Sequence, residues 1–141
     1  MVVALGLLAA GCGGGDAGKL SKEEYVSKLN AICADFNAKQ KEIGVPQSIP
    51  EVAEKGPEII DEFDKALDKV KDLEPPDEIA DQANRFIELT DQQRDLVQEL
   101  IDAAKDNDAA RLREIGSKIE PIDAEADQIA TELGAPACGA N

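Results

Sequence analysis

The sequence predicts an all-α protein, a four-helix up-down-up-down bundle closed by one disulfide. Apolar residues recur at intervals of three and four in four segments, and no alternating run bounded by turns predicts a strand. Short polar, Gly- or Pro-containing connections separate the segments, which favours antiparallel neighbours. Aromatic residues make up only 3% of the chain, so the core must be built mainly from aliphatic side chains.

The first helix is predicted from Ser21 to Gly44, and a second helical region begins at Ser48. Ser21 with Glu24 forms a capping box, and Gly44 is a typical C-terminal stop. In the second region Gly56-Pro57 is expected to break or kink the helix, leaving a regular part over 58–73 before Pro75-Pro76. The inward stripes are Tyr25, Val26, Leu29, Ile32, Cys33 and Phe36, then Ile59, Ile60, Phe63, Leu67, Val70 and Leu73.

The third helix is predicted over 77–105, and the fourth follows Asp106-Asn107-Asp108 and ends at Gly134, with a kink at Pro121. Thr90 and Gln93 interrupt the apolar stripe of the third helix. Three interpretations are possible: a buried polar layer whose hydrogen bonds are satisfied, a slightly rotated stripe, or a polar contact inside a ligand cavity. The stripes are Ile79, Ala83, Phe86, Ile87, Val97, Leu100, Ile101 and Ala104, then Leu112, Ile115, Ile119, Ile122, Ala126, Ile129 and Leu133.

Residues 1–11 are predicted to be a lipoprotein signal peptide, with Cys12 as the lipidation site. The apolar run 1–10 is too short to span a membrane, and Ala9-Ala10-Gly11-Cys12 resembles a lipobox. No Lys or Arg precedes the run, so we expect a basic stretch upstream. The alternatives are an ordinary cleaved signal, which would make the protein secreted, or an irrelevant apolar tail.

The Gly-rich residues 12–20 are predicted to form a flexible tether, and residues 21–141 the helical bundle domain. The expected location is therefore the outer face of the cell membrane, held there by the N-terminal lipid.

Assigning Cys12 to a lipid leaves Cys33 and Cys138 as a disulfide pair in an exported protein. Pro136 would help to hold residues 134–138 extended, and an extended tail could run back about 16 Å toward Cys33. The long loop that the bond closes is worth about 4–5 kcal/mol. Two buried free thiols and a zinc site are the alternatives, although two cysteines without histidine supply too few zinc ligands.

The net charge of −15 argues against nucleic-acid binding and against electrostatic docking on an anionic membrane. It also discourages self-association, so we expect a monomer. The chain has no histidine, which removes the usual general base and any Ser-His-Asp arrangement. We therefore expect no enzyme activity, no catalytic residues and no cofactor.

Acidic residues gather on two helix faces, Glu120, Asp123 and Asp127 on the fourth helix and Glu88, Asp91 and Asp95 on the third. They are interpreted as a solvated surface, with weak cation binding as the alternative. No EF-hand-like loop is present, so no metal site is predicted.

Three segments, LSKEEYVSKLNAIC at 20–33, LEPP at 73–76 and ELGAPACG at 132–139, resemble an uncharacterised family of small secreted proteins and lipoproteins of actinobacteria. The resemblance implies a helical extracytoplasmic domain with this cysteine pair, and it supplies no activity. Our main expectation is a membrane-anchored, non-catalytic interaction or structural module with a protein or cell-wall partner. The alternatives are weak cation binding and a carrier or sensor of a small apolar ligand. A carrier would need a cavity of roughly a few hundred Å³ between the second and third helices.

Overall fold

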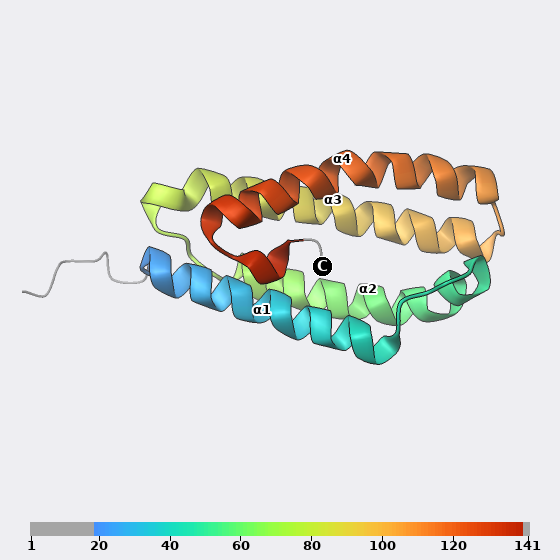
Figure 1. Ribbon diagram of the computed structural model, residues 1–141, viewed down its shortest axis with the longest axis horizontal. Helices are drawn as coiled ribbons and strands as arrows, with labels where there is room; N and C mark the ends of the chain where they lie inside the picture. Colours follow the sequence, from blue (N-terminus) through green and yellow to red (C-terminus); the bar gives the residue numbers. More distant parts are fainter. Residues whose placement is uncertain (1–18, 140–141) are drawn as a thin grey trace, which may run out of the picture.

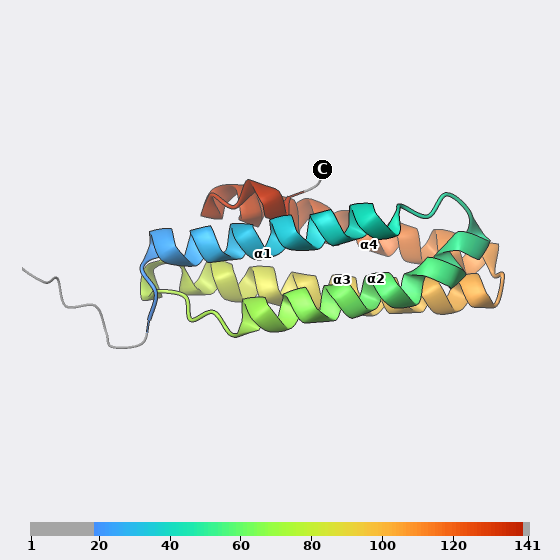
Figure 2. The same ribbon diagram turned by 90° about the horizontal axis from the view of Figure 1, so that it is seen from below.

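The computed structural model describes residues 19–139 and contains four helices that alternate in direction along one bundle (Figures 1 and 2). The predicted all-α, up-down-up-down fold is confirmed, and no strand occurs within the described residues. The helices are α1 (Lys22–Ile43), α2 (Ile49–Lys71), α3 (Ala80–Lys105) and α4 (Ala109–Leu133). Two short 3₁₀ helices complete the chain, η1 (Asp77–Ile79) before α3 and η2 (Pro136–Cys138) after α4.

The predicted helix ends are set by side-chain caps. The Ser21 hydroxyl accepts a hydrogen bond from the Glu24 N–H at 3.2 Å, and the Glu24 carboxylate accepts one from the Ser21 N–H at 3.0 Å. Gly44 ends α1 with a φ of 86°, a conformation that favours glycine. At the start of α2 the Ser48 hydroxyl accepts from the Glu51 N–H, and at the start of α4 the Asp108 carboxylate accepts from the Ala110 and Arg111 N–H groups. Local chemistry therefore determines where these helices begin and end.

Of the predicted break or kink at Gly56-Pro57, the break is wrong, because α2 runs through both residues without interruption. Gly56 is buried against α3, and a Cβ atom placed on it would lie 2.5 Å from Ile101 Cγ1. Pro57 is exposed on the other side of the helix. The close packing on α3 therefore holds a sequence that would be a poor helix by itself. In α4, Pro121 also lies within a continuous helix, and the helix changes direction near its middle (Figure 1).

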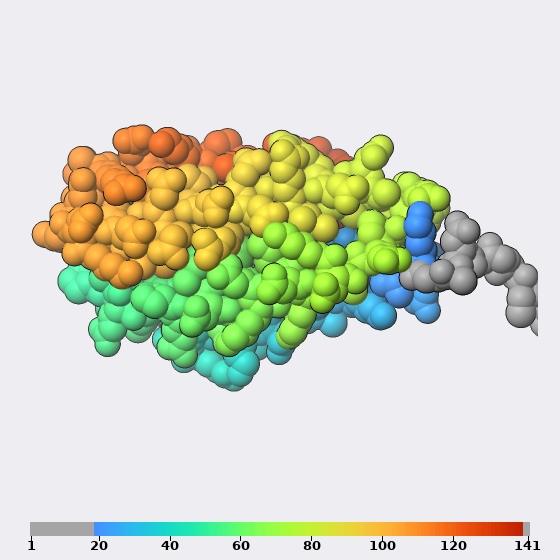
Figure 3. All heavy atoms as spheres, turned by 180° about the vertical axis from the view of Figure 1, so that it is seen from behind, coloured from blue at the N-terminus to red at the C-terminus, as the bar shows by residue number. Residues whose placement is uncertain are grey.

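Each helix packs on its neighbour in sequence, but α1 and α4 hardly touch through their backbones. The tail containing η2 lies between α1 and α4 instead (Figure 1), whereas α2 and α3 lie directly side by side (Figure 3). The main buried cluster joins all four helices and is formed by Tyr25, Leu29, Val70, Ile79, Ala83, Phe86, Leu89, Ala126, Ile129, Ala130, Leu133 and Ala135. We call the boundary between two adjacent helices of the bundle a seam. Three seams are direct helix-helix contacts, and the fourth, between α1 and α4, is filled by the tail.

Two arginines of α3 tie it to both of its neighbours. Arg94 donates to both carboxylate oxygens of Asp64 on α2, at 2.7 and 3.0 Å. Arg85 donates to both oxygens of Glu125 on α4, at 2.8 and 3.0 Å. Paired bonds of this kind fix the relative register of two helices as well as adding attraction.

The start of α1 and the end of α4 lie at the same end of the bundle, and the α1–α2 loop lies at the other (Figure 1). At the first end the Leu20 N–H donates to the Glu74 carbonyl at 3.4 Å, and Lys19 forms an ion pair with Asp77. The last two residues of the predicted tether 12–20 thus contact the bundle. The predicted signal peptide 1–11 and the lipidation site Cys12 lie outside the described residues.

Two glycines inside helices should respond oppositely to alanine. Gly116 of α4 has open space around it, so Gly116→Ala should raise the free energy of unfolding by about 1 kcal/mol. Gly56→Ala should lower the free energy of unfolding by about 1–3 kcal/mol, because the new methyl group meets Ile101. Urea unfolding followed by circular dichroism measures both changes.

A double mutant separates the contact from an intrinsic effect of the alanine. In an Ile101→Ala background Gly56→Ala should cost less than in the natural protein, because the opposing side chain is gone. An equal cost in the two backgrounds would show that the packing of Gly56 on α3 is not the cause.

Candidate functional site: an apolar pocket beside the disulfide

The C-terminal tail is turned back into the bundle immediately after α4. Gly134 ends α4 in the left-handed conformation, with φ 85° and ψ 28°, and Ala135 after it is buried. Pro136 then starts the 3₁₀ helix η2, in which the Cys138 N–H donates to the Ala135 carbonyl at 3.0 Å. The prediction of an extended tail is therefore wrong, because hydrogen bonds within the tail and to α1 fold it into a turn.

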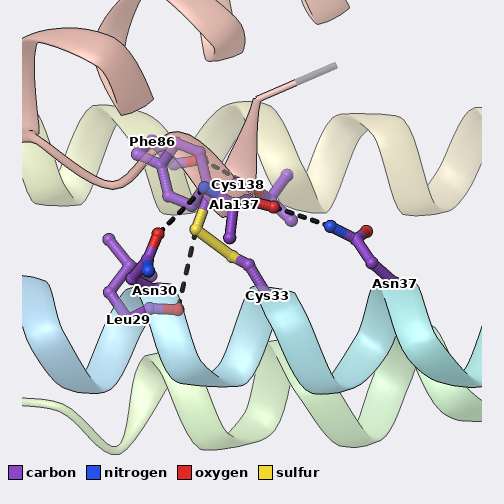
Figure 4. The surroundings of a disulfide bond; sticks show 8 residues. Leu29, Asn30, Cys33, Asn37, Phe86, Ala137 and Cys138 are labelled. Carbon is purple, nitrogen blue, oxygen red and sulfur yellow. Dashed lines mark hydrogen bonds between the residues drawn. A yellow bond between two sulfur atoms is a disulfide. The ribbon is translucent and has the colours of Figure 1, made fainter. Parts of the chain in front are cut away.

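Two asparagines of α1 hold the backbone of one tail residue (Figure 4). The Ala137 N–H donates to Asn30 Oδ1 at 2.9 Å, and Asn37 Nδ2 donates to the Ala137 carbonyl at 2.8 Å. Asn30 and Asn37 lie about one turn before and one turn after Cys33 on the same face of the helix. This asparagine clamp places the next residue, Cys138, directly opposite Cys33.

Cys33 and Cys138 form the predicted disulfide, with their Cα atoms 5.0 Å apart and 105 positions apart in the sequence. The alternatives of free thiols and of a zinc site are thereby excluded for this pair. A disulfide of this kind indicates an extracytoplasmic location, because thiols are kept reduced in the cytosol. Among the helices of residues 19–139, none has the length and apolar character needed to cross a membrane.

A pocket of about 120 Å³, partly open to solvent, lies beside the disulfide. All four helices and the tail contribute to it, so its walls come from segments far apart in the sequence. The lining residues are Ile32, Cys33, Phe36, Asn37, Phe63, Ala66, Leu67, Val70, Phe86, Thr90, Gln93, Ala126, Ala137, Cys138 and Gly139. The tail is one wall of this pocket, which therefore depends on the disulfide and on the asparagine clamp.

All three phenylalanines of the chain line the pocket. Phe36 of α1 and Phe63 of α2 pack edge to face, with ring centroids 5.3 Å apart, and Phe86 of α3 lies beside Cys138 (Figure 4). Edge-to-face packing is a favourable geometry for aromatic rings. The walls are therefore mainly apolar, and the two small residues Ala66 and Ala126 leave the space that is not filled.

The two polar residues that interrupt the third stripe, Thr90 and Gln93, both reach this pocket. The Thr90 hydroxyl donates to the Phe86 carbonyl at 2.8 Å, and Gln93 Nε2 donates to Asp123 Oδ1 at 2.6 Å. The interpretation of a satisfied polar layer is correct for these bonds, and the two residues also border a cavity. The interruption of the apolar stripe by Thr90 and Gln93 was the only sign of the pocket in the sequence, because the other lining residues occupy ordinary core positions of their helices.

Asp123 is a partly buried carboxylate at the edge of this region. Burial raises its pKa above the usual 3.8, the hydrogen bond from Gln93 acts in the opposite direction, and the charge of Asp127 adds to the increase. Asp64, in contrast, has a lowered pKa because Arg94 donates hydrogen bonds to it.

The acidic face predicted on α3 is paired with basic residues. Glu88 pairs with Arg85 at 2.8 Å, Asp91 with Lys71 at 2.6 Å, and Asp95 with Arg94 at 3.6 Å. On α4, Asp123 accepts from Gln93, as described above. Between residues 19 and 139 no group of three or more Asp, Glu, His or Cys side chains is arranged to hold a metal ion.

The fold and the site define an antiparallel four-helix domain whose fourth seam is closed by a disulfide-linked tail beside a small apolar pocket. The chain belongs to the family described as a domain of unknown function, DUF7018, whose sequence model matches residues 19–130. The match runs from the start of the bundle into α4 and stops before the tail. No curated protein and no solved structure matches the chain. The match confirms that the chain belongs to an uncharacterised family. That the family is actinobacterial and that the protein is a lipoprotein stay predictions.

The asparagine clamp can be tested by hydrogen exchange at one amide. Asn30→Ala removes the acceptor of the Ala137 N–H, so this amide should exchange about two- to tenfold faster. Asn37→Ala is the matched control, because it removes only the bond to the Ala137 carbonyl. Two-dimensional NMR of the oxidised domain gives both rates. Unchanged exchange in the Asn30 variant would contradict the clamp.

Replacing Asp123 by Asn should make the protein more stable at pH 7. The folded-state pKa is raised, so the folded state binds more protons than the unfolded state and stability falls as pH rises through this range. Asn removes the partly buried charge and keeps an oxygen that can accept from Gln93. Urea unfolding over a pH series should show a gain at pH 7 that vanishes below the usual aspartate pKa of 3.8.

Asp64→Asn is the control of opposite sign. The pKa of Asp64 is lowered, so its contribution is present above the unfolded-state value and is lost as pH falls through the folded-state value. This variant should be less stable than the natural protein at pH 7 and equal to it in acid. A gain in stability at pH 7 for both variants would indicate a general effect of net charge instead of these two environments.

Proposed function

We propose that the protein is a membrane-anchored extracytoplasmic lipoprotein with a non-catalytic interaction or structural role. The observation that carries the proposal is the Cys33–Cys138 disulfide, which uses two of the three cysteines. Cys12 is then the single remaining cysteine, and it follows the small residues Ala9-Ala10-Gly11 as a lipidated cysteine does. The resemblance to small actinobacterial secreted proteins and lipoproteins supports the same assignment.

The partner proposed for this module is a protein or a component of the cell wall. A chain without histidine lacks the most common general base and metal ligand, which supports a binding role over a catalytic one. A net charge of −15 supports a monomer that avoids nucleic acid and anionic surfaces. The helical surface is then the part that is presented to the partner.

A second candidate function is a carrier or sensor of a small apolar ligand, and the pocket beside the disulfide is the observation that favours it. The pocket lies among all four helices, whereas a position between the second and third helices was expected. Its volume of about 120 Å³ is below the roughly 300–1,000 Å³ of pockets for drug-sized ligands. A carrier of this kind would therefore hold a molecule no larger than one ring or a short branched chain.

Replacing Cys12 by Ser should release the protein from the membrane. The full-length protein, expressed in its own cell, should partition into the detergent phase and incorporate an alkyne-labelled fatty acid. The Cys12→Ser variant should do neither, because the acceptor thiol is missing. Detergent-phase partitioning followed by immunoblotting measures the distribution.

The control is a Cys33→Ser/Cys138→Ser variant, which keeps Cys12 and should stay with the membrane. Fatty-acid labelling that persists after Cys12→Ser would overturn the anchor. The interaction role is tested by crosslinking at exposed positions of the anchored protein in intact cells. Turnover of a substrate by the purified domain, with no specific crosslink in the cell, would contradict it.

A further inference from the structure

We propose that the pocket binds a small apolar molecule that carries one O–H or N–H donor, and that Thr90 and Gln93 accept the hydrogen bond. This inference rests on the carrier or sensor function and names its class of ligand: alcohols, phenols and amines about the size of one ring. Acids of the same size are discriminated against. The argument depends on the size of the pocket, on the use of its donors and on charge.

The size and the walls of the pocket determine the apolar part of the ligand. A cavity of about 120 Å³ is close to the roughly 150 Å³ that accommodates one benzene molecule. The walls include three phenylalanines together with Ile32, Leu67 and Val70. The lining also contains the polar residues Asn37, Thr90 and Gln93, so a polar substituent on the ring can be met by a polar wall.

Each polar side chain of the lining already donates one hydrogen bond to the protein. Thr90 donates to the Phe86 carbonyl, Gln93 donates to Asp123, and Asn37 donates to the Ala137 carbonyl. Within residues 19–139 no protein group donates to the hydroxyl oxygen of Thr90 or to the side-chain carbonyl oxygens of Gln93 and Asn37. Each of the three side chains therefore has an unused acceptor oxygen, Thr90 has no donor left, and each amide keeps one N–H.

The carboxylate of Asp123 fixes the orientation of the Gln93 amide. A carboxylate accepts hydrogen bonds, so the NH₂ group of Gln93 must point toward α4 and its carbonyl oxygen is the free end. Thr90 and Gln93 are three residues apart on α3, so they lie on the same helix face. Both residues line the pocket and are its polar contribution from α3.

The negative charge near the pocket favours the same ligands as the hydrogen-bond acceptors do, because it disfavours anions. Asp123 lies directly behind Gln93, and the whole chain carries a net charge of −15. An anionic ligand would bring further negative charge to acceptor oxygens that cannot bond to it, whereas an alcohol or amine pairs with them. This combination disfavours carboxylic acids and favours donor-bearing apolar molecules.

Three probes of nearly equal size separate these chemistries: toluene, benzyl alcohol and benzoate. The purified, disulfide-bonded protein is titrated with each at pH 7, and the methyl resonances of Ile32, Leu67 and Val70 are followed by NMR. Benzyl alcohol should bind about two- to tenfold more tightly than toluene, which is the range expected for one net hydrogen bond. Benzoate should bind more weakly than toluene.

A double variant tests the two acceptors. Thr90→Val/Gln93→Met keeps the volume nearly constant and removes both oxygens, so benzyl alcohol should bind no more tightly than toluene. The matched control is Gln128→Met/Thr131→Val on α4. Thr131 makes the same bond to the carbonyl four residues earlier, at 2.9 Å, and Gln128 also donates to a carboxylate, at 2.9 Å, but neither lines the pocket. This control should keep the preference of the natural protein.

Thr90→Val alone is the conservative variant if the double variant does not fold, and it should reduce the preference for benzyl alcohol. Ala66→Leu, which fills the pocket, should abolish the methyl shifts with all three probes. Equal affinity for the three probes would overturn the donor inference and leave the carrier function in place. Absence of any shift in the natural protein would overturn both.

Discussion

The covalent link between Cys33 and Cys138 closes the one seam of the bundle that helix packing leaves open. Three pairs of neighbouring helices pack directly, but the backbones of α1 and α4 hardly approach each other, and the tail fills the space between them. Ala137 is held by asparagines on either side of Cys33, so the bond forms at a position that hydrogen bonds already define. The order of the fourth seam therefore depends on a few atoms of the tail.

The pocket is a consequence of the insertion of the tail between α1 and α4. A short 3₁₀ turn presents less side-chain volume than a helix face, and the nearby Ala66 and Ala126 do not compensate. The three phenylalanines occupy much of the remaining space without closing it. A domain with so few aromatic residues thus gathers most of them at the position where its packing is least complete.

The sequence predicted the parts of the structure that local chemistry determines. The helix ends lie where they were expected, because capping and positive φ depend on neighbouring residues alone: α1 is capped by Ser21 and Gly44, and α4 ends at its cap Gly134. The path through Gly56-Pro57 could not be predicted, since it depends on Ile101 of another helix. The pocket could not be predicted from the sequence either. Each of its three phenylalanines lies on the ordinary apolar stripe of its own helix, and only the fold brings together Phe36, Phe63 and Phe86.

The shared position of the first residues of α1 and the last residues of α4 gives the bundle two unlike ends (Figure 1). An anchor reached through Lys19 would place that end next to the lipid, with the long axis of the domain leading outward. The α1–α2 loop and the connection between α3 and α4 would then stand at the outer end, and α1 alone spans about 33 Å of that length. Val45, a large apolar side chain that is 67% exposed, lies in the loop between α1 and α2, two residues after the end of α1. An approaching macromolecule would therefore meet these two connections first, and one of them carries this valine.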